Sequence, residues 1–334
     1  MKNILIITTI TILFLLSSCT DNKNQVIVYT SVDQIFSEPI LKEYKKTTGI
    51  EVKVIYDTEE TKSTGVLNRL IAEKDNPICD VFWSGDPVRP IVLKNKDILQ
   101  KYIPVNAKNI NPIYKSKNGY WTGFSARARV LIYNKDSVSD SMIPESIFDL
   151  TNSKYDGKFA IANPLFGTTT FHIAAIFTAI GAEKAKIFLQ ELKQNNVVIA
   201  TSNGDVKKRV INGEVWLGLT DTDDAYEAIK EGANIGVVFL DQDGIGSLIM
   251  PNSVCLIKNS PNQENGKKII DYLLSKETEA KLAESCAQMP LHKNVEIPEY
   301  IPSLDNIKPM NIDYDKTSKE LENIQQYLKE WAEN

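Results

Sequence analysis

Apolar and polar residues alternate along the chain with two different periods, and this alternation predicts an α/β protein. Short apolar runs of strand length, such as Gln25–Thr30 and Glu51–Tyr56, are separated by segments in which apolar residues recur at helical spacing. Ile40, Leu41 and Tyr44 are one example of this spacing. The further strands that we expect are Asp80–Trp83, Val130–Tyr133, Lys158–Ala162, Val197–Ala200, Val215–Leu219, Ile235–Phe239 and Ser253–Ile257. Because strands alternate with helices, we expect largely parallel sheets with helices packed on them.

The end of the chain has the pattern of a single amphipathic helix. Between Lys316 and Trp331, charged residues occupy one face of the predicted helix and apolar residues recur at helical spacing on the other. We expect this helix to close the chain, with its charged face in solvent. The residues expected to pack inward are Leu321, Ile324, Leu328 and Trp331.

The first residues have the pattern of a secretory signal peptide. Lys2 precedes an apolar run from Ile4 to Leu16, which is too short to cross a bilayer as an anchor. The run ends in Leu-Ser-Ser followed by Cys19, which resembles a bacterial lipobox, where the cysteine thiol accepts a diacylglycerol group. We therefore expect residues 1–18 to be a lipoprotein signal peptide, Cys19 to be lipidated and residues 19–24 to form a tether. The mature protein would then be extracytoplasmic and anchored to a membrane, in the periplasm or at the cell surface.

Composition narrows the classes of function. The chain has 334 residues, of which 43% are hydrophobic and 24% charged, as in ordinary globular proteins, and it is long enough for two lobes. Its net charge is −5 and it contains no basic block, so we expect no nucleic-acid partner. With two histidines and no GxSxG or HExxH motif, we expect no enzyme.

Three cysteines remain after Cys19, and none stands at a spacing typical of zinc sites. In an oxidising compartment, Cys255 and Cys286 either form a disulfide or are buried free thiols. Cys79 has no partner in this pairing and would be a free thiol.

Polar residues follow the predicted strands at six places. Each segment on its own fits a helix N-cap, because Ser, Thr, Asp and Asn are the usual capping residues. Open α/β sheets, however, bind ligands at the carboxyl ends of their strands, so six such segments together predict one shared cleft. The residues in these segments that we expect to contact a ligand are Ser31, Asp33, Glu60, Ser84, Thr168, Thr169, Thr170, Ser202, Asp221, Asp223 and Asp224.

Four segments carry a resemblance to a known family. They are VYTSVDQIFSEPILKEYKKTTGI (Val28–Ile50), RLIAEKDNPICDVFWSGDP (Arg69–Pro87), ARARVLIYN (Ala126–Asn134) and GEVWLGLTDTDDA (Gly213–Ala225). In their order and spacing, the chain resembles the extracellular solute-binding proteins of ABC importers, in the group that includes ferric-ion, thiamine and sugar-phosphate binders. The resemblance implies the periplasmic-binding-protein type II fold, in which two α/β lobes close on a ligand by a hinge motion. It also implies a permease and an ATPase as partners, and no resident cofactor.

The resemblance divides the chain into lobes. Lobe I is expected to comprise residues 25–125 plus about 245–300, lobe II about 126–244, and the C-terminal segment 301–334. We expect the chain to cross between the lobes near Phe124–Leu131 and again near Phe239–Met250. Gly244 and Gly246 would absorb the backbone change at the second crossing.

The class of ligand depends on one departure from the family pattern. Ferric-binding members have adjacent tyrosines after the strand that aligns with Val215–Leu219, whereas this chain has Asp223 and Asp224, with a lone Tyr226 beyond. Carboxylate oxygens also bind hard cations, so iron(III) held by these three residues, with Asp33 and Glu60 as further oxygen donors, remains the alternative. We expect the two histidines, His172 and His292, to be structural.

A phosphorylated or phosphonate organic anion fits the remaining residues better. Gly167–Thr170 opens a predicted helix, whose first backbone N–H groups attract such an anion. Arg127 and Arg129 would point to the same side of a strand and clamp an anion, or else form a salt bridge. Asp223 and Asp224 would accept hydrogen bonds from hydroxyls or an amine at the far end of the ligand. Trp83 has two alternatives, since it either stacks on the ligand or packs in the core. A further alternative is a binder of a polyamine-like or thiamine-like cation, or a ligand-sensing subunit.

Overall fold

The structure, a computed structural model, describes residues 24–57 and 64–333. The expected signal peptide, the lipidation site at Cys19 and the expected ligand contact at Glu60 lie outside these residues. Within the described part of the chain, no helix is both long enough and apolar enough to cross a membrane.

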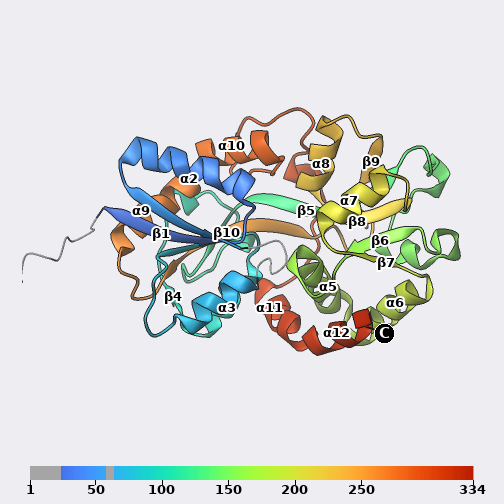
Figure 1. Cartoon of the computed structure of the whole chain (residues 1–334), viewed down its shortest axis with the longest axis horizontal. Helices are drawn as coiled ribbons and strands as arrows, with labels where there is room; N and C mark the ends of the chain where they lie inside the picture. Colours follow the sequence, from blue (N-terminus) through green and yellow to red (C-terminus); the bar gives the residue numbers. More distant parts are fainter. Residues whose placement is uncertain (1–23, 58–63, 334) are drawn as a thin grey trace, which may run out of the picture.

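The strands form two half-sheets that belong to two lobes, as expected for the α/β fold (Figure 1). They are β1 (Gln25–Thr30), β2 (Glu51–Tyr56), β3 (Val81–Ser84), β4 (Leu99–Gln100), β5 (Thr122–Asn134), β6 (Phe159–Ala162), β7 (Val198–Ala200), β8 (Leu217–Asp221), β9 (Ile235–Val238) and β10 (Ile249–Ile257). The hydrogen-bonded order is β2-β1-β3-β10-β5-β8-β6-β7, with β4 paired to β10 and β9 paired to β5. We call the half with β1 to β4 lobe I and the half with β6 to β9 lobe II.

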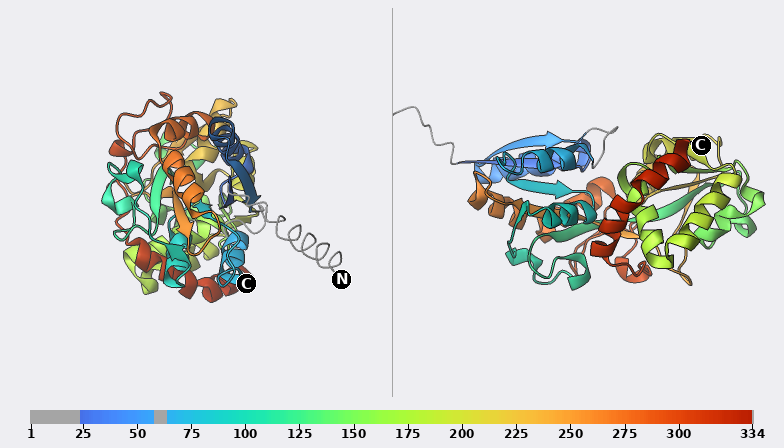
Figure 2. Two further views of the ribbon diagram at one scale, coloured as in Figure 1. Left: turned by 90° about the vertical axis from the view of Figure 1, so that its left-hand side faces the viewer. Right: turned by 90° about the horizontal axis from the view of Figure 1, so that it is seen from below.

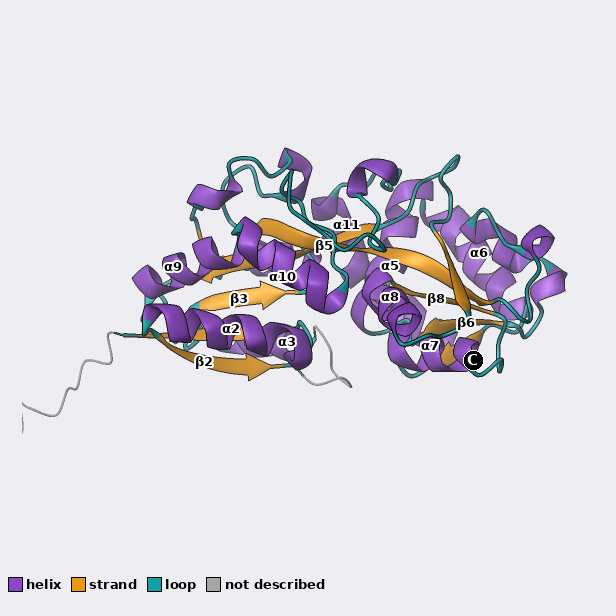
Figure 3. Ribbon diagram, turned by 90° about the horizontal axis from the view of Figure 1, so that it is seen from above, coloured by secondary structure: helices purple, strands orange, loops and turns teal. Residues whose placement is uncertain are grey.

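Strand β5 links the two lobes. Its first half pairs with β10, and its second half pairs with β8 and β9 of lobe II. Figure 3 shows β5 as one long strand that runs from one lobe into the other. The sequence pattern predicted a strand only from Val130 to Tyr133, because the preceding residues 122–129 mix glycine, serine and arginine with apolar residues.

The expectation of largely parallel sheets is wrong for the middle of the molecule. The strands β1, β2 and β3 are parallel, as are β6, β7 and β8. Every pair made by β5 or β10 is antiparallel, so the sheet as a whole is mixed. The reason is that β5 and β10 pass between the lobes in opposite directions, which a pattern of alternating strands and helices does not reveal.

Helices cover both faces of each half-sheet. They are α2 (Gln34–Thr48), α3 (Gly65–Ala72), α4 (Val88–Asn95), α5 (Gly167–Ile180), α6 (Ala182–Gln194), α7 (Asn203–Ile211), α8 (Thr222–Lys230), α9 (Gln263–Leu273), α10 (Lys276–Cys286), α11 (Tyr314–Asn323) and α12 (Gln325–Glu333). In lobe I, α2, α9 and α10 pack on one face around Val28, and α3 and α4 pack on the other around Phe82. In lobe II, α5 and α6 pack on one face around Leu219, and α7 and α8 pack on the other around Val130. The carboxyl ends of the parallel strands in both lobes are therefore left to face the space between the lobes.

The C-terminal segment differs from the single helix that the pattern predicted. It breaks at Ile324 into α11 and α12. Helix α11 packs against α4 of lobe I and α5 of lobe II, where the Ser318 hydroxyl donates to the Val88 carbonyl at 3.1 Å. Helix α12 turns onto lobe II, where the Trp331 indole donates to the Leu189 carbonyl at 2.9 Å. Figure 2 shows these helices in red across the junction of the lobes. The break lets one amphipathic sequence follow two surfaces.

The cysteines of the described residues are free thiols. Cys255 packs with Cys79 in the core beneath α3 and α4, whereas Cys286 packs in the core beneath α2 and α9, on the opposite face of the lobe I sheet. The alternative of a Cys255–Cys286 disulfide is therefore wrong, because the sheet separates the two sulfur atoms. Burial raises the pKa of both thiols, which disfavours the reactive thiolate.

Candidate functional site

A cavity of about 240 Å³ lies between the lobes. Lobe I contributes the loops after β1 and β3, and lobe II contributes the first turns of α5, α7 and α8, so most of the wall consists of segments that follow strands. Among the expected ligand contacts, nine line this cavity: Ser31, Asp33, Arg127, Thr168, Thr169, Ser202, Asp221, Asp223 and Asp224. We call it the interlobe cavity.

The structure places three of the expected contacts behind the wall. Ser84 is buried at the end of β3, where its hydroxyl accepts a hydrogen bond from the Asp86 amide at 3.3 Å. Thr170 points into the core side of α5 and is 1% exposed. Arg129 is also buried, in an ion pair described below. These three residues do not line the cavity, but each lies next to residues that do and supports their positions.

Other lining residues were not singled out from the sequence. Asn163 follows β6 directly. Asp86 and Asn203 lie in the same polar segments as the expected contacts Ser84 and Ser202, but they were not among the expected contacts. Glu227 lies one helical turn after Asp223, so helical spacing from the acidic pair could have identified it. The apolar lining residues, among them Phe166, had no signal that distinguished them from core residues.

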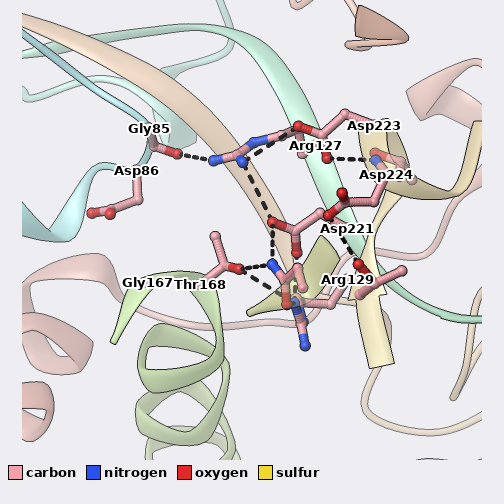
Figure 4. Close-up of polar contacts among 12 residues, drawn as sticks. Gly85, Asp86, Arg127, Arg129, Gly167, Thr168, Asp221, Asp223 and Asp224 are labelled. Atoms are coloured by element: carbon pink, nitrogen blue, oxygen red, sulfur yellow. Dashed lines mark hydrogen bonds and ion pairs between the residues drawn. The ribbon is translucent and has the colours of Figure 1, made fainter. Parts of the chain in front are cut away.

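Arg127 connects the two lobes at the cavity wall (Figure 4). Its Nη2 donates to the Gly85 carbonyl of lobe I at 2.6 Å. Its Nη1 lies at the longer distances of 3.4 Å from Asp221 Oδ2 and 3.5 Å from Asp223 Oδ2 of lobe II. Burial alone would lower the pKa of Arg127, but the charges of Asp223 and Asp221 outweigh burial and raise it. The guanidinium is thus a permanent cation in the wall.

Arg129 is two residues further along β5 and points to the same side, as the strand period predicted. Its Nη1 donates to Asp221 Oδ1 at 2.7 Å, to Asn203 Oδ1 at 3.0 Å and to Thr168 Oγ1 at 3.2 Å. Its Nη2 donates to the Leu219 carbonyl at 3.1 Å. Arg129 therefore forms the salt bridge that was the alternative to an anion clamp, and it fixes the first turns of α5 and α7 beside each other.

The carboxylates of the wall have different charge states. Burial would raise the pKa of Asp221, but Arg129 and Arg127 outweigh it and lower the pKa, so Asp221 is ionised. For Asp223, burial and the neighbouring charges of Asp224, Asp221 and Asp33 outweigh the attraction of Arg127 and raise the pKa to about 7. Asp223 therefore gains from a ligand that brings positive charge or hydrogen-bond donors to it.

The remaining acidic side chains of this side of the cavity are Asp224 and Glu227. Asp224 accepts from the Thr220 hydroxyl at 3.0 Å and lies 3.7 Å from the Lys207 ammonium. Lys207 also pairs with Glu227. One lysine therefore offsets part of the negative charge of α8.

The first turn of α5 brings backbone amides to the cavity. Its N-cap is Phe166, whose apolar side chain cannot cap the helix, and Gly167, Thr168 and Thr169 line the cavity. Gly167 has a left-handed φ of 59°, which glycine adopts without strain. By contrast, α7 is capped by Ser202, whose hydroxyl accepts from the Asp205 amide at 3.1 Å. The positive end of α5 is thus available to an anion in the cavity.

Three further expectations concern aromatic and histidine side chains. Trp83 is fully buried and packs on Phe124 with ring centroids 5.6 Å apart, so it belongs to the core and does not stack on a ligand. Tyr226 packs towards Tyr300, with ring centroids 6.3 Å apart, and does not line the interlobe cavity. Burial and the charge of Arg129 lower the pKa of His172 to about 3, so this histidine is neutral inside α5. Among the residues that the structure describes, no group of three or more His, Cys, Asp or Glu side chains is placed to hold a metal ion.

The chain is similar to known proteins over nearly its whole length. It is 26% identical over 309 residues to iron uptake protein A1 of Synechocystis sp., which covers 88% of this chain and 83% of that protein. It is 25% identical over 292 residues to a protein of Salmonella typhimurium provisionally named a 2-aminoethylphosphonate-binding periplasmic protein, covering 86% of this chain and 80% of that protein. The crystal structure of apo ferric ion-binding protein A from Pasteurella haemolytica superposes with a TM-score of 0.83 at 25% identity, covering 92% of this chain and 98% of that one.

The family assignment rests on a match that includes both lobes. Residues 40–305 match the family model for bacterial extracellular solute-binding proteins. The two-lobe fold and the cavity between the lobes agree with this match. The chain therefore belongs to the bacterial extracellular solute-binding protein family, as a solute-binding protein of an ABC importer with the type II fold.

Proposed function

We propose that this protein captures, for uptake, a small organic ligand that has a phosphate or phosphonate group at one end and an amine or hydroxyls at the other. The observation that carries the proposal is the polarity of the interlobe cavity. One side presents the uncapped amide end of α5, and the other presents the carboxylates of Asp223 and Asp224.

The first turn of α5 supports the anionic end of the ligand. Backbone N–H groups at a helix N-terminus and the helix dipole favour a phosphate or phosphonate, and Thr168 and Thr169 add hydroxyls there. Arg127 adds a cation whose Nη1 has only long contacts of 3.4 and 3.5 Å within the protein. A ligand oxygen would therefore compete well for this nitrogen.

The carboxylates support a cationic or hydroxyl-bearing end. An ammonium group beside Asp223 would stabilise the ionised carboxylate, which burial and three acidic neighbours otherwise disfavour. The relative provisionally named for 2-aminoethylphosphonate binding is consistent with a ligand that has both ends.

Iron(III) is the second candidate, because other relatives are named for iron uptake or ferric binding. The acidic wall would supply oxygen ligands. The phenol of Tyr226 does not support this candidate, since its ring packs towards Tyr300 and Tyr226 does not line the cavity. We therefore rank the organic ligand first.

Delivery would require a membrane permease and an ATPase, and we propose that the protein meets them as a lipoprotein anchored through Cys19. The lipobox-like Leu-Ser-Ser-Cys sequence supports this anchor. Metabolic labelling with a fatty-acid probe should label the wild type and leave Cys19→Ala unlabelled. Equal labelling of the two proteins would contradict the anchor.

Calorimetry with a panel of ligands tests the ligand class. The panel contains 2-aminoethylphosphonate, sugar phosphates, spermidine and ferric citrate, with metal analysis of the purified protein. We expect binding of a phosphonate or phosphate ester in metal-free buffer. Binding of ferric citrate with no response to the organic anions would overturn the proposal in favour of iron.

A further inference from the structure

Strand β5 contains an irregular residue where it runs between the lobes. Pro251 of β10 pairs with Ala126 and Asn252 pairs with Phe124, so Ser125 is left over as a bulge. Its φ is +40°, in the left-handed region that a serine rarely adopts. Ser125 lies two residues before Arg127, which bridges the lobes at the cavity. The bulge is therefore placed to set the direction in which β5 enters lobe II.

The backbone groups of the bulge are held by side chains instead of a strand partner. The Ser125 amide donates to Glu279 Oε1 of α10 at 2.7 Å, and the Ser125 carbonyl accepts from Asn252 Nδ2 at 2.7 Å. The next residue, Ala126, exchanges two hydrogen bonds of 2.7 Å with Met289, in the loop after α10. The amide and the carbonyl of Ser125 are buried, so loss of the Glu279 or Asn252 side chain would leave an unpaired polar group.

Glu279 is itself held by a buried histidine. The side chain of Glu279 is 0% exposed, and its oxygens also accept from the backbone amides of Leu291 and His292 at 2.8 and 2.9 Å. His292 Nδ1 lies 2.8 Å from Glu279 Oε2, and His292 Nε2 lies 2.9 Å from the carbonyl oxygen of Asn106.

The two ring nitrogens of His292 therefore face two acceptors. A backbone carbonyl has no hydrogen to give, and the carboxylate already receives three backbone N–H groups, so both nitrogens must donate. Only the imidazolium form of histidine carries two N–H groups. The geometry thus requires the Glu279–His292 pair to hold a proton on the ring.

We propose that the Glu279–His292 pair is a proton-dependent clamp on the hinge between the lobes. With His292 protonated, the pair holds the Ser125 bulge and the loop around Asn106. Loss of the proton leaves one ring nitrogen facing an oxygen without a hydrogen between them, and leaves the buried carboxylate without its counter-ion. The hinge then becomes looser, whatever the ligand is.

The surroundings of His292 agree with this role. The hydrogen bond to Glu279 raises the pKa of His292, helped by the charge of Glu279 and the Asn106 carbonyl, while burial and Lys276 of α10 oppose this. The nearby Asp271 of α9 is engaged by the Tyr102 hydroxyl and the Val105 amide and braces the segment that contains Asn106. A raised pKa means that the clamp is complete below about pH 6.5 and is lost as the pH rises through the folded-state pKa.

The chain contains two histidines, so NMR of histidine-labelled full-length protein can follow the proton directly. We expect the signal that disappears in His292→Gln to titrate with a midpoint above about 6.5, the ordinary value. His172, whose pKa lies near 3, should not titrate above pH 5. A midpoint for His292 at or below the ordinary value would overturn the proposal.

Hydrogen exchange of ligand-free protein tests the effect on the hinge. After correction for intrinsic rates, protection of the peptide over 122–128 should fall about tenfold or more from pH 6 to pH 9, while β1 stays protected. In His292→Gln it should be low at both pH values. Glu279→Gln should behave likewise, whereas Glu284→Gln, an exposed change on the same helix, should match the wild type. Equal protection at both pH values in the wild type, or an undiminished fall in His292→Gln, would refute the clamp. Neither result depends on the proposed ligand.

Discussion

Arg129 and Asp221 form an ion pair of 2.7 Å in which each side chain is 1% exposed, with Asp221 in the wall of the interlobe cavity and Arg129 behind it. The pair joins β5 to the end of β8, and Arg129 extends it to Thr168 and Asn203 at the starts of α5 and α7. It therefore holds in place three segments that the ligand is proposed to contact.

Removing one partner of this pair should be strongly destabilising. Asp221→Asn removes the counter-ion of Arg129, whose side chain is 1% exposed, and we expect a loss of about 3–5 kcal/mol in the free energy of unfolding. The matched control is Glu214→Gln, which breaks the exposed pair with Arg209 at 3.2 Å and should cost at most about 1 kcal/mol. Denaturant unfolding measures both. Similar small losses in the two variants would show that Arg129 finds another partner.

Asp223 should make the ligand-free protein less stable as the pH rises. Its folded-state pKa of about 7 lies above the value of about 3.9 for an unfolded chain, so the native state binds the extra proton between these values. Stability from this group is complete below pH 4 and falls up to pH 7. Asp223→Asn should therefore raise the melting temperature at pH 8 and change it little at pH 4. The exposed control Asp243→Asn should not show this pattern.

The same carboxylates should control binding of an amine-bearing ligand. Replacing Asp223 and Asp224 by Asn keeps the shape of the wall but removes its charge. Hydrogen bonds to charged groups contribute about 1.5–3 kcal/mol, so calorimetry with 2-aminoethylphosphonate should show affinity reduced about tenfold to more than a hundredfold. Thr168→Ala should reduce affinity less, because the backbone amides of α5 remain. An unchanged affinity in the double variant would place the amine elsewhere.

Much of the wall could be predicted from the sequence because its position follows from chain direction. The carboxyl ends of parallel strands meet at one edge, so Ser31, Thr168 and Asp221 come together although they are far apart in the sequence. The division of roles between Arg127 and Arg129 could not be predicted in this way. This division depends on Asp221, which is more than 90 positions away in the sequence. The pairing of β5 with β8 brings Asp221 next to Arg129.

Burial of polar strands also limits what a pattern reveals. Strand β5 is buried from Thr122 to Ile132, yet it contains Ser125, Arg127 and Arg129, and groups from other elements bind the Ser125 amide and the terminal nitrogens of both arginines. Hydrophobic periodicity indicates a loop for such a segment. Trp83 could not be assigned from the sequence, because a large aromatic residue at a strand end fits a ligand contact or a core equally well until its neighbour Phe124 is known.

Gly246, at the second crossing between the lobes, and Gly232, which precedes it, both have a left-handed backbone. Comparing alanine at the two positions distinguishes the cost of backbone strain from the cost of a steric contact. Gly246 has φ +84° and Gly232 has φ +90°, so alanine is strained at both. A Cβ at Gly232 would meet open space, whereas at Gly246 it would lie 2.6 Å from the backbone of Pro309, where the C-terminal segment bridges to Ser247. We expect Gly246→Ala to cost about 1–3 kcal/mol more than Gly232→Ala, since the backbone of residues 308–310 must shift. Hydrogen exchange should also show faster exchange in α11 for Gly246→Ala, because this segment leads into that helix. Equal losses in the two variants would mean that the C-terminal segment gives way without cost.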